Sequence, residues 1–146
     1  MPRIAGLFLL LLLLPLPAFT GGGKEPTEEV VVQMLGQLEK LADTLSSLKD
    51  EDTVAAAREP LKKGVQNFLD LRAKAEKLPP PSREVKDRLA KEYKGKFIAV
   101  QEKLMLEISR VRSAVPGGRE ALKEVSALLG KEAKAKESKE KKDKGD

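Results

Sequence analysis

The sequence predicts an all-α protein, an antiparallel three-helix bundle with a short fourth helix, built as one domain. Apolar residues recur at spacings of three and four over most of the chain, whereas the alternation that marks strands is nearly absent. Proline and glycine clusters divide this pattern into segments joined by short connections, so helices that are consecutive in sequence are expected to be neighbours in space. The 146 residues include no cysteine, one tyrosine and four phenylalanines, so the core must form by aliphatic packing without disulfides.

The start of the chain predicts a secretory signal peptide over residues 1–22. Arg3 precedes an apolar run with six consecutive leucines at 9–14, which is followed by prolines and glycines. That order of charged, apolar and small residues is typical of a signal peptide. The alternative is a membrane anchor, but the run is shorter than the ~20 residues that a span needs. We expect cleavage between Thr20 and Lys24, export to the periplasm or the cell exterior, and no membrane span afterwards.

The first helix of the exported chain is predicted over 28–48. Thr27 is its expected N-cap, and Glu28 and Glu29 follow where the helix dipole favours negative charge. Its apolar residues form one heptad seam of the coiled-coil type. The seam consists of Val31, Met34, Leu38, Leu41, Leu45 and Leu48.

The second helix is predicted over 51–78, with Asp50 as its N-cap. Pro60 predicts a bend, because proline removes one backbone hydrogen bond inside a helix. Three consecutive prolines at 79–81 end the helix. The apolar seam consists of Val54, Ala57, Leu61, Gly64, Phe68, Leu71, Ala75 and Leu78.

The third helix is predicted over 83–115, with Ser82 as its N-cap. Ile98 and Met105 widen its apolar stripe enough to predict contacts with two neighbouring helices, whereas Leu106 falls outside the stripe and is expected to be exposed. The rest of the stripe consists of Val85, Leu89, Tyr93, Phe97, Val100, Leu104, Ile108, Val111 and Val115.

The fourth helix is predicted over 119–129, after a proline-glycine-glycine break, and Gly130 is expected to end it. The bundle is therefore predicted to span 27–130. Residues 131–146 are rich in lysine and contain no apolar residue larger than alanine. Because such a segment cannot bury enough apolar surface to offset the entropy of ordering, we predict a disordered tail.

The residue inventory excludes most kinds of catalytic and metal site. The chain has no histidine and no cysteine. A histidine-based triad, a thiolate nucleophile and a zinc site built from these residues are therefore impossible. An enzyme would have to rely on lysine, carboxylates or Tyr93, so we predict no enzymatic activity and no catalytic, cofactor-binding or metal-binding residues.

The acidic run from Asp50 to Asp52 matches the start of a calcium-binding loop, but only in part. An EF-hand needs glycine at its sixth position and a carboxylate at its twelfth, and these positions hold Ala55 and Leu61. Helix capping is the better explanation for the run.

Two other patterns also have structural explanations. Met34 and Met105 lie on apolar faces, so core packing is predicted for them in preference to haem ligation. Ser46 and Ser47 have no base nearby in sequence except Lys49, which predicts a solvated helix end in preference to a Ser-Lys pair.

The charge distribution predicts at most weak attraction to polyanions. The chain has 28 basic and 23 acidic residues, and the last sixteen residues carry seven lysines against five acids. In this tail, interleaved acids and the lack of aromatic residues for stacking argue against nucleic acid as a partner. The tail is predicted either to attract anionic envelope polymers or only to keep the protein soluble.

The segment from Leu41 to Thr53 resembles the helix-turn-helix region of a group of small exported bacterial helical proteins of unassigned function. The matching residues also include Ala55-Ala56-Ala57, Pro60-Leu61-Lys62 and Glu92-Tyr93-Lys94. The resemblance implies an envelope protein and carries no catalytic residues. We therefore expect a non-enzymatic envelope interaction or structural module, with an unidentified protein or an anionic envelope polymer as partner. The alternative is a periplasmic chaperone-like holdase or a weak polyanion binder.

Overall fold

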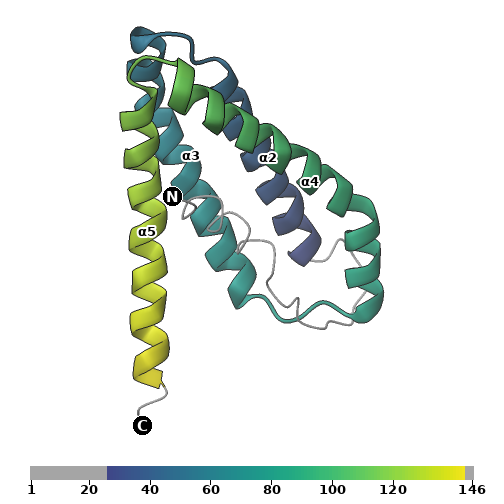
Figure 1. Ribbon diagram of the computed structural model, residues 1–146. Helices are drawn as coiled ribbons and strands as arrows, with labels where there is room; N and C mark the ends of the chain where they lie inside the picture. The colour runs from purple at the N-terminus through teal and green to yellow at the C-terminus, as the bar shows by residue number, and fades with distance from the viewer. Residues whose placement is uncertain (1–25, 144–146) are drawn as a thin grey trace.

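The computed structural model describes residues 26–143, and it describes side chains for 26–130. That part of the chain is helical without any strand, which confirms the predicted all-α fold. The predicted signal peptide lies outside the described residues. The four helices alternate in direction, as Figure 1 shows. They are α2 (Pro26–Ser46), α3 (Glu51–Lys77), α4 (Arg83–Ala114) and α5 (Gly118–Asp143).

The first three helices begin and end within two residues of the predicted boundaries. The start of α2 is a correction, because the helix begins at Pro26 and Thr27 lies inside its first turn. Thr27 is therefore not the N-cap. Proline is well suited to the first position of a helix, where the backbone N–H that it lacks would have no partner.

The starts of α3 and α4 are capped as predicted. The Asp50 carboxylate accepts a hydrogen bond from the Thr53 backbone N–H at 2.9 Å, and the Thr53 hydroxyl accepts one from the Asp50 N–H at 3.0 Å. This reciprocal arrangement is a capping box. The hydrogen bond from the Thr53 backbone also holds the pKa of Asp50 below its usual value. At α4, the Ser82 hydroxyl accepts from the Val85 N–H at 3.3 Å.

Helix α2 packs against both α3 and α4, and α5 packs against the same two helices. By contrast α3 and α4 hardly touch, although they are consecutive in sequence. The expectation that short connections make all consecutive helices neighbours is wrong for this pair. Its connection contains three prolines and runs in extended form, so it separates the two helix ends (Figure 1).

Two ion pairs between α2 and α4 show the register in which these helices pack. Glu28 pairs with Arg88 at 2.8 Å and Asp43 pairs with Lys103 at 2.7 Å, so each partner lies 60 residues further along the chain. A constant offset means that the two helices run parallel. The hydrogen bond to Asp43 raises the pKa of Lys103. Such exposed pairs each stabilise a fold by at most ~1 kcal/mol, so they mark the register more than they hold it.

The buried core is aliphatic, as predicted, with Phe68 as its buried aromatic residue among the described residues. The contribution of α4 is smaller than expected, because only three of its residues are fully buried and both Ile98 and Met105 are exposed. The apolar stripe of α4 that contacts other helices is therefore narrower than predicted. Helix α4 packs against two neighbours, α2 and α5, as predicted, but these neighbours leave Ile98 and Met105 uncovered. Leu106 is exposed, as predicted.

The turn between α4 and α5 depends on two glycines. Gly117 has φ of +73°, the left-handed conformation that glycine adopts without strain. At Gly118 a Cβ atom would overlap the backbone carbonyl oxygen of Val111. The turn can therefore close tightly only with a hydrogen atom at both positions.

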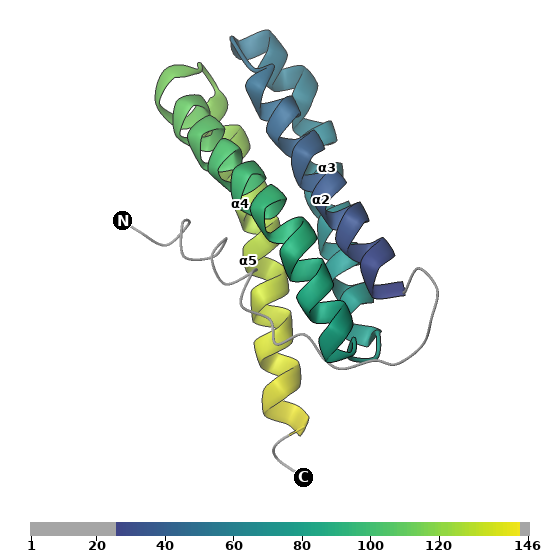
Figure 2. The same ribbon diagram turned by 90° about the vertical axis from the view of Figure 1, so that its right-hand side faces the viewer.

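Helix α5 is longer than predicted. It runs from Gly118 to Asp143, whereas the sequence predicted a helix over 119–129 followed by a disordered tail over 131–146. The correction covers 131–143, and the last three residues lie outside the described part. Gly130 does not end the helix, because Gly117 is the one glycine with positive φ among the described residues. Alanine, lysine and glutamate, which dominate the following segment, are strong helix formers. Figures 1 and 2 show this part of α5 extending beyond the ends of the other helices.

We expect Leu61→Ala to lower the free energy of unfolding by about 2–5 kcal/mol, because Leu61 is fully buried and its removal leaves a cavity. Leu106→Ala removes the same atoms from an exposed position and should change stability by less than about 0.5 kcal/mol. Urea unfolding followed by circular dichroism measures both. Equal losses in the two variants would contradict the packing described here.

Candidate functional site

The described helices contain neither a cluster of metal-ligating side chains nor a segment that could cross a membrane. Within the described residues no group of three or more acidic, histidine or cysteine side chains is placed to hold a metal ion. None of these helices combines the length and the apolar character that crossing a membrane requires. The candidates for function are therefore polar clusters between helices and exposed surfaces.

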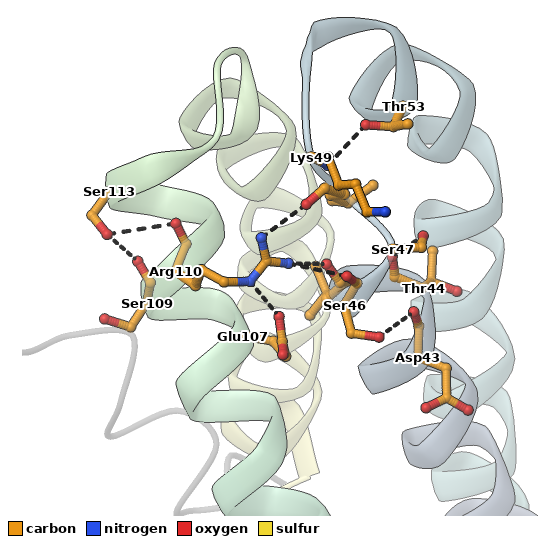
Figure 3. Close-up of polar contacts among 12 residues, drawn as sticks. Asp43, Thr44, Ser46, Ser47, Lys49, Thr53, Glu107, Ser109, Arg110 and Ser113 are labelled. Atoms are coloured by element: carbon orange, nitrogen blue, oxygen red, sulfur yellow. Dashed lines mark hydrogen bonds and ion pairs between the residues drawn. The ribbon is translucent and has the colours of Figure 1, made fainter.

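The polar side chain that makes the most hydrogen bonds between helices is Arg110 of α4, at the end of α2 (Figure 3). Its guanidinium donates hydrogen bonds to the carbonyl oxygens of Leu45 and Leu48, each at 2.8 Å, and more weakly to that of Ser46 at 3.4 Å. It also pairs with Glu107 at 2.7 Å, which holds the side chain in place. Residue spacing does not reveal Arg110 as a capping residue, because the carbonyl groups that it contacts lie more than sixty residues away in the sequence.

This cluster has a structural role at the C-terminus of α2. The last carbonyl groups of a helix lack partners within the helix and carry partial negative charge. The last turn of α2 contains no basic residue of its own. Arg110 supplies the missing donors and the missing positive charge from the neighbouring helix, so it acts as a C-cap from outside α2.

The hydroxyl groups near this cluster are engaged with the backbone. Ser46 donates to the carbonyl oxygen of Asp43 at 2.9 Å, and Ser47 donates to that of Thr44 at 2.7 Å (Figure 3). The described residues place no lysine or carboxylate side chain in hydrogen-bond contact with either serine. This arrangement supports a helix end and offers no activated nucleophile.

Tyr93, the one tyrosine of the chain, is half-buried on α4. Burial is the main cause that raises the pKa of its phenol, and the hydrogen bond with Glu92 raises it further. The ammonium group of Lys96 lies 5.0 Å from the ring centroid, which is cation–π distance. A raised pKa keeps the phenol protonated near neutral pH, so these surroundings do not activate Tyr93 as a base or nucleophile.

A second polar cluster joins α3 to α5. Glu124 pairs with Lys62 at 3.0 Å and with Arg58 at 3.4 Å, and Lys62 also pairs with Glu59 at 3.2 Å. The hydrogen bond from Lys62 lowers the pKa of Glu124, and the same bond raises the pKa of Lys62. These ion pairs join α5 to α3, although the buried Nε atom of Arg58 has no hydrogen-bond partner.

The predicted roles of the two methionines have different outcomes. Met34 is half-buried and packs against the core, as predicted. Met105 was predicted to pack in the core, and this is wrong, because half of its surface is exposed on α4. The acidic run from Asp50 to Asp52 starts α3, with Asp50 as its cap.

The remaining candidate is a surface, which we call the outer face of α4. It is defined by four exposed residues of α4, which are Ile98, Glu102, Met105 and Leu106. The three large apolar side chains among them, Ile98, Met105 and Leu106, have 44%, 50% and 71% of their surface exposed. The sequence predicted exposure for Leu106 alone. Ile98 and Met105 were missed because their spacing fits a core stripe, and spacing alone does not show that the neighbouring helices leave them uncovered.

No protein-family model, curated protein or solved structure matches this chain. The resemblance of the segment from Leu41 to Thr53 to small exported helical proteins therefore stays a prediction. Residue roles follow here from the geometry of the chain itself.

We expect Arg110→Gln to lower the free energy of unfolding by about 1–2 kcal/mol, because it leaves carbonyl groups at the end of α2 without a charged donor. Amide hydrogen exchange should accelerate in the last turn of α2. Arg112→Gln is the matched control, because Arg112 lies in the last turn of α4 and is exposed. Identical unfolding of the two variants would show that Arg110 does not cap α2.

The cluster around Glu124 predicts a pH dependence. Because its pKa in the folded protein lies below the usual value of 4.5, the carboxylate contributes stability above that value and loses it as the pH falls through the lowered pKa. Urea midpoints of the wild type should therefore fall more steeply in acid than those of Glu124→Gln. The other carboxylates titrate alike in both proteins, so parallel curves would contradict the assigned role of Glu124.

Proposed function

We propose that this protein is a non-enzymatic interaction module of the cell envelope, exported by a signal peptide at residues 1–22 and attached to a partner through the outer face of α4. The exposure of Ile98, Met105 and Leu106 on one helix carries the proposal. Large apolar side chains grouped on a surface are typical of sites that another molecule covers. The engaged hydroxyls of Ser46 and Ser47 and the raised pKa of Tyr93 support a non-catalytic role.

A holdase is less well supported by the same surface. A chaperone that holds unfolded clients needs a broad apolar surface that accepts many sequences. The outer face of α4 has three large apolar residues and an exposed carboxylate, Glu102, among them. A carboxylate in that position selects among partners, which favours a specific contact.

Export is tested by mass spectrometry of the protein produced in its own host. We expect an N-terminus between Gly21 and Lys24 in the envelope or secreted fraction. A chain that keeps Met1 and resists carbonate extraction from membranes would mean that the apolar run is an anchor.

The interaction role is tested by a photo-crosslinking amino acid placed at Leu106 in the exported protein. We expect a discrete crosslinked product from this position and none from Ala56, an exposed control position on α3. Equal labelling from the two positions, or none from either, would overturn the proposal.

A further inference from the structure

The outer face of α4 carries a second seam with the spacing of a coiled coil. Its positions recur every three or four residues, and all of them are exposed. The seam covers three heptads, or about 32 Å at about 1.5 Å per residue. Its residues are Lys91, Gly95, Ile98, Glu102, Met105, Ser109 and Arg112, with Leu106 beside Met105.

We propose that this seam docks one amphipathic α-helix of a partner protein, a helix with a Lys or Arg opposite Glu102 and acidic residues opposite the ends of the seam. The inference rests on the proposed function and names the class of partner. The apolar side of the docked helix covers Ile98, Met105 and Leu106, which no helix of this chain covers in the described structure.

Charge defines the partner. Glu102 lies one turn from both Ile98 and Leu106, and it makes no ion pair with another described residue. Docking an apolar helix over that carboxylate would bury an unpaired charge, which is strongly unfavourable. A basic residue at the matching position removes this cost and fixes the register.

The ends of the seam have the opposite sign. Lys91 and Lys94 are exposed at one end, and Arg112 is exposed at the other. The charge order along the seam is therefore positive, negative, positive. A complementary helix carries negative charge at both ends and positive charge at its centre. This order of charges distinguishes it from most amphipathic helices.

Gly95 supports an external contact at this face. Glycine inside a helix costs roughly 0.5–1 kcal/mol relative to alanine. A Cβ atom at Gly95 would meet nothing within 4 Å, so packing inside this chain does not require glycine there. An exposed glycine lets a docked helix approach the backbone of α4 closely.

The same charges argue against two other occupants. A second copy docked about a twofold axis at Glu102 would bring the two Glu102 carboxylates together and place the basic ends, Lys91 and Arg112, opposite one another. An anionic lipid surface would suit Lys91, Lys94 and Arg112, but its apolar layer would have to accept Glu102 along with Met105 and Leu106.

The test uses two labelled synthetic helices of about three heptads, titrated into the mature protein and followed by fluorescence anisotropy. Both carry leucines at the seam positions and glutamates near the ends, and they differ only at the centre, which is lysine in one and glutamate in the other. We expect the lysine-centred helix to bind at least ten-fold more tightly. Glu102→Lys should reverse this preference.

Two variants locate the contact. The double variant Met105→Ser/Leu106→Ser should weaken binding of the lysine-centred helix at least ten-fold. Val32→Ser is the matched control, because Val32 is similarly exposed (46%) but lies on α2. Unchanged urea midpoints confirm that all variants fold, as expected for exposed positions.

Three outcomes would overturn the inference. Equal binding of the two helices would show that Glu102 does not select the partner. A dimer of the mature protein that Met105→Ser/Leu106→Ser dissociates would assign the face to a second copy. Binding to phosphatidylglycerol vesicles that the same variant abolishes, without binding of either helix, would assign it to lipid.

Export and crosslinking from Leu106 are measured separately from helix binding. Failure of the helix test therefore leaves the proposed function standing. Failure of export or of crosslinking removes that function, whatever the result with the helices.

Discussion

Burial of α2 between α3 and α4 is the constraint on which the rest of the fold depends. Six residues of α2 are buried, more per turn than in α4, and α2 is the main neighbour of both α3 and α4. Helices α3 and α4 therefore meet through α2 and α5 and hardly touch each other. The proline-rich connection keeps their ends apart, since three consecutive prolines hold the chain extended. With α2 removed, neither α3 nor α4 would have its main neighbour.

The end of α2 is the point where this arrangement is held most specifically. Arg110 reaches from α4 to the carbonyl oxygens of Leu45 and Leu48, and Leu48 itself is fully buried just beyond the helix. Asp50 then caps α3 within two residues. The end of α2, the buried Leu48 and the start of α3 are therefore adjacent in one compact region. A flexible lysine would not satisfy several carbonyls at once, because it lacks the planar fork of the guanidinium group.

The surface follows from the same packing. Each helix has two main neighbours, and those of α4 are α2 and α5. The apolar residues of α4 therefore fall into two sets, one buried against these helices and one exposed with Glu102 among its members. The polar cluster around Glu124, by contrast, forms ion pairs between α3 and α5. This contrast is why the outer face of α4, and no polar cluster, supports the proposed docking role.

The sequence by itself determined the helical class, the boundaries of the first three helices to within two residues, and the caps at Asp50 and Ser82, because these depend on contacts between residues three or four apart. It also excluded histidine and cysteine chemistry, since those residues are missing. Only the tertiary structure decided that α3 and α4 stay apart, that Met105 is exposed and that Arg110 caps α2. Periodicity shows which face of a helix is apolar, but not which element covers that face. The covering element depends on the path of the connections and on pairs more than sixty residues apart, and these are settled only when the whole chain packs.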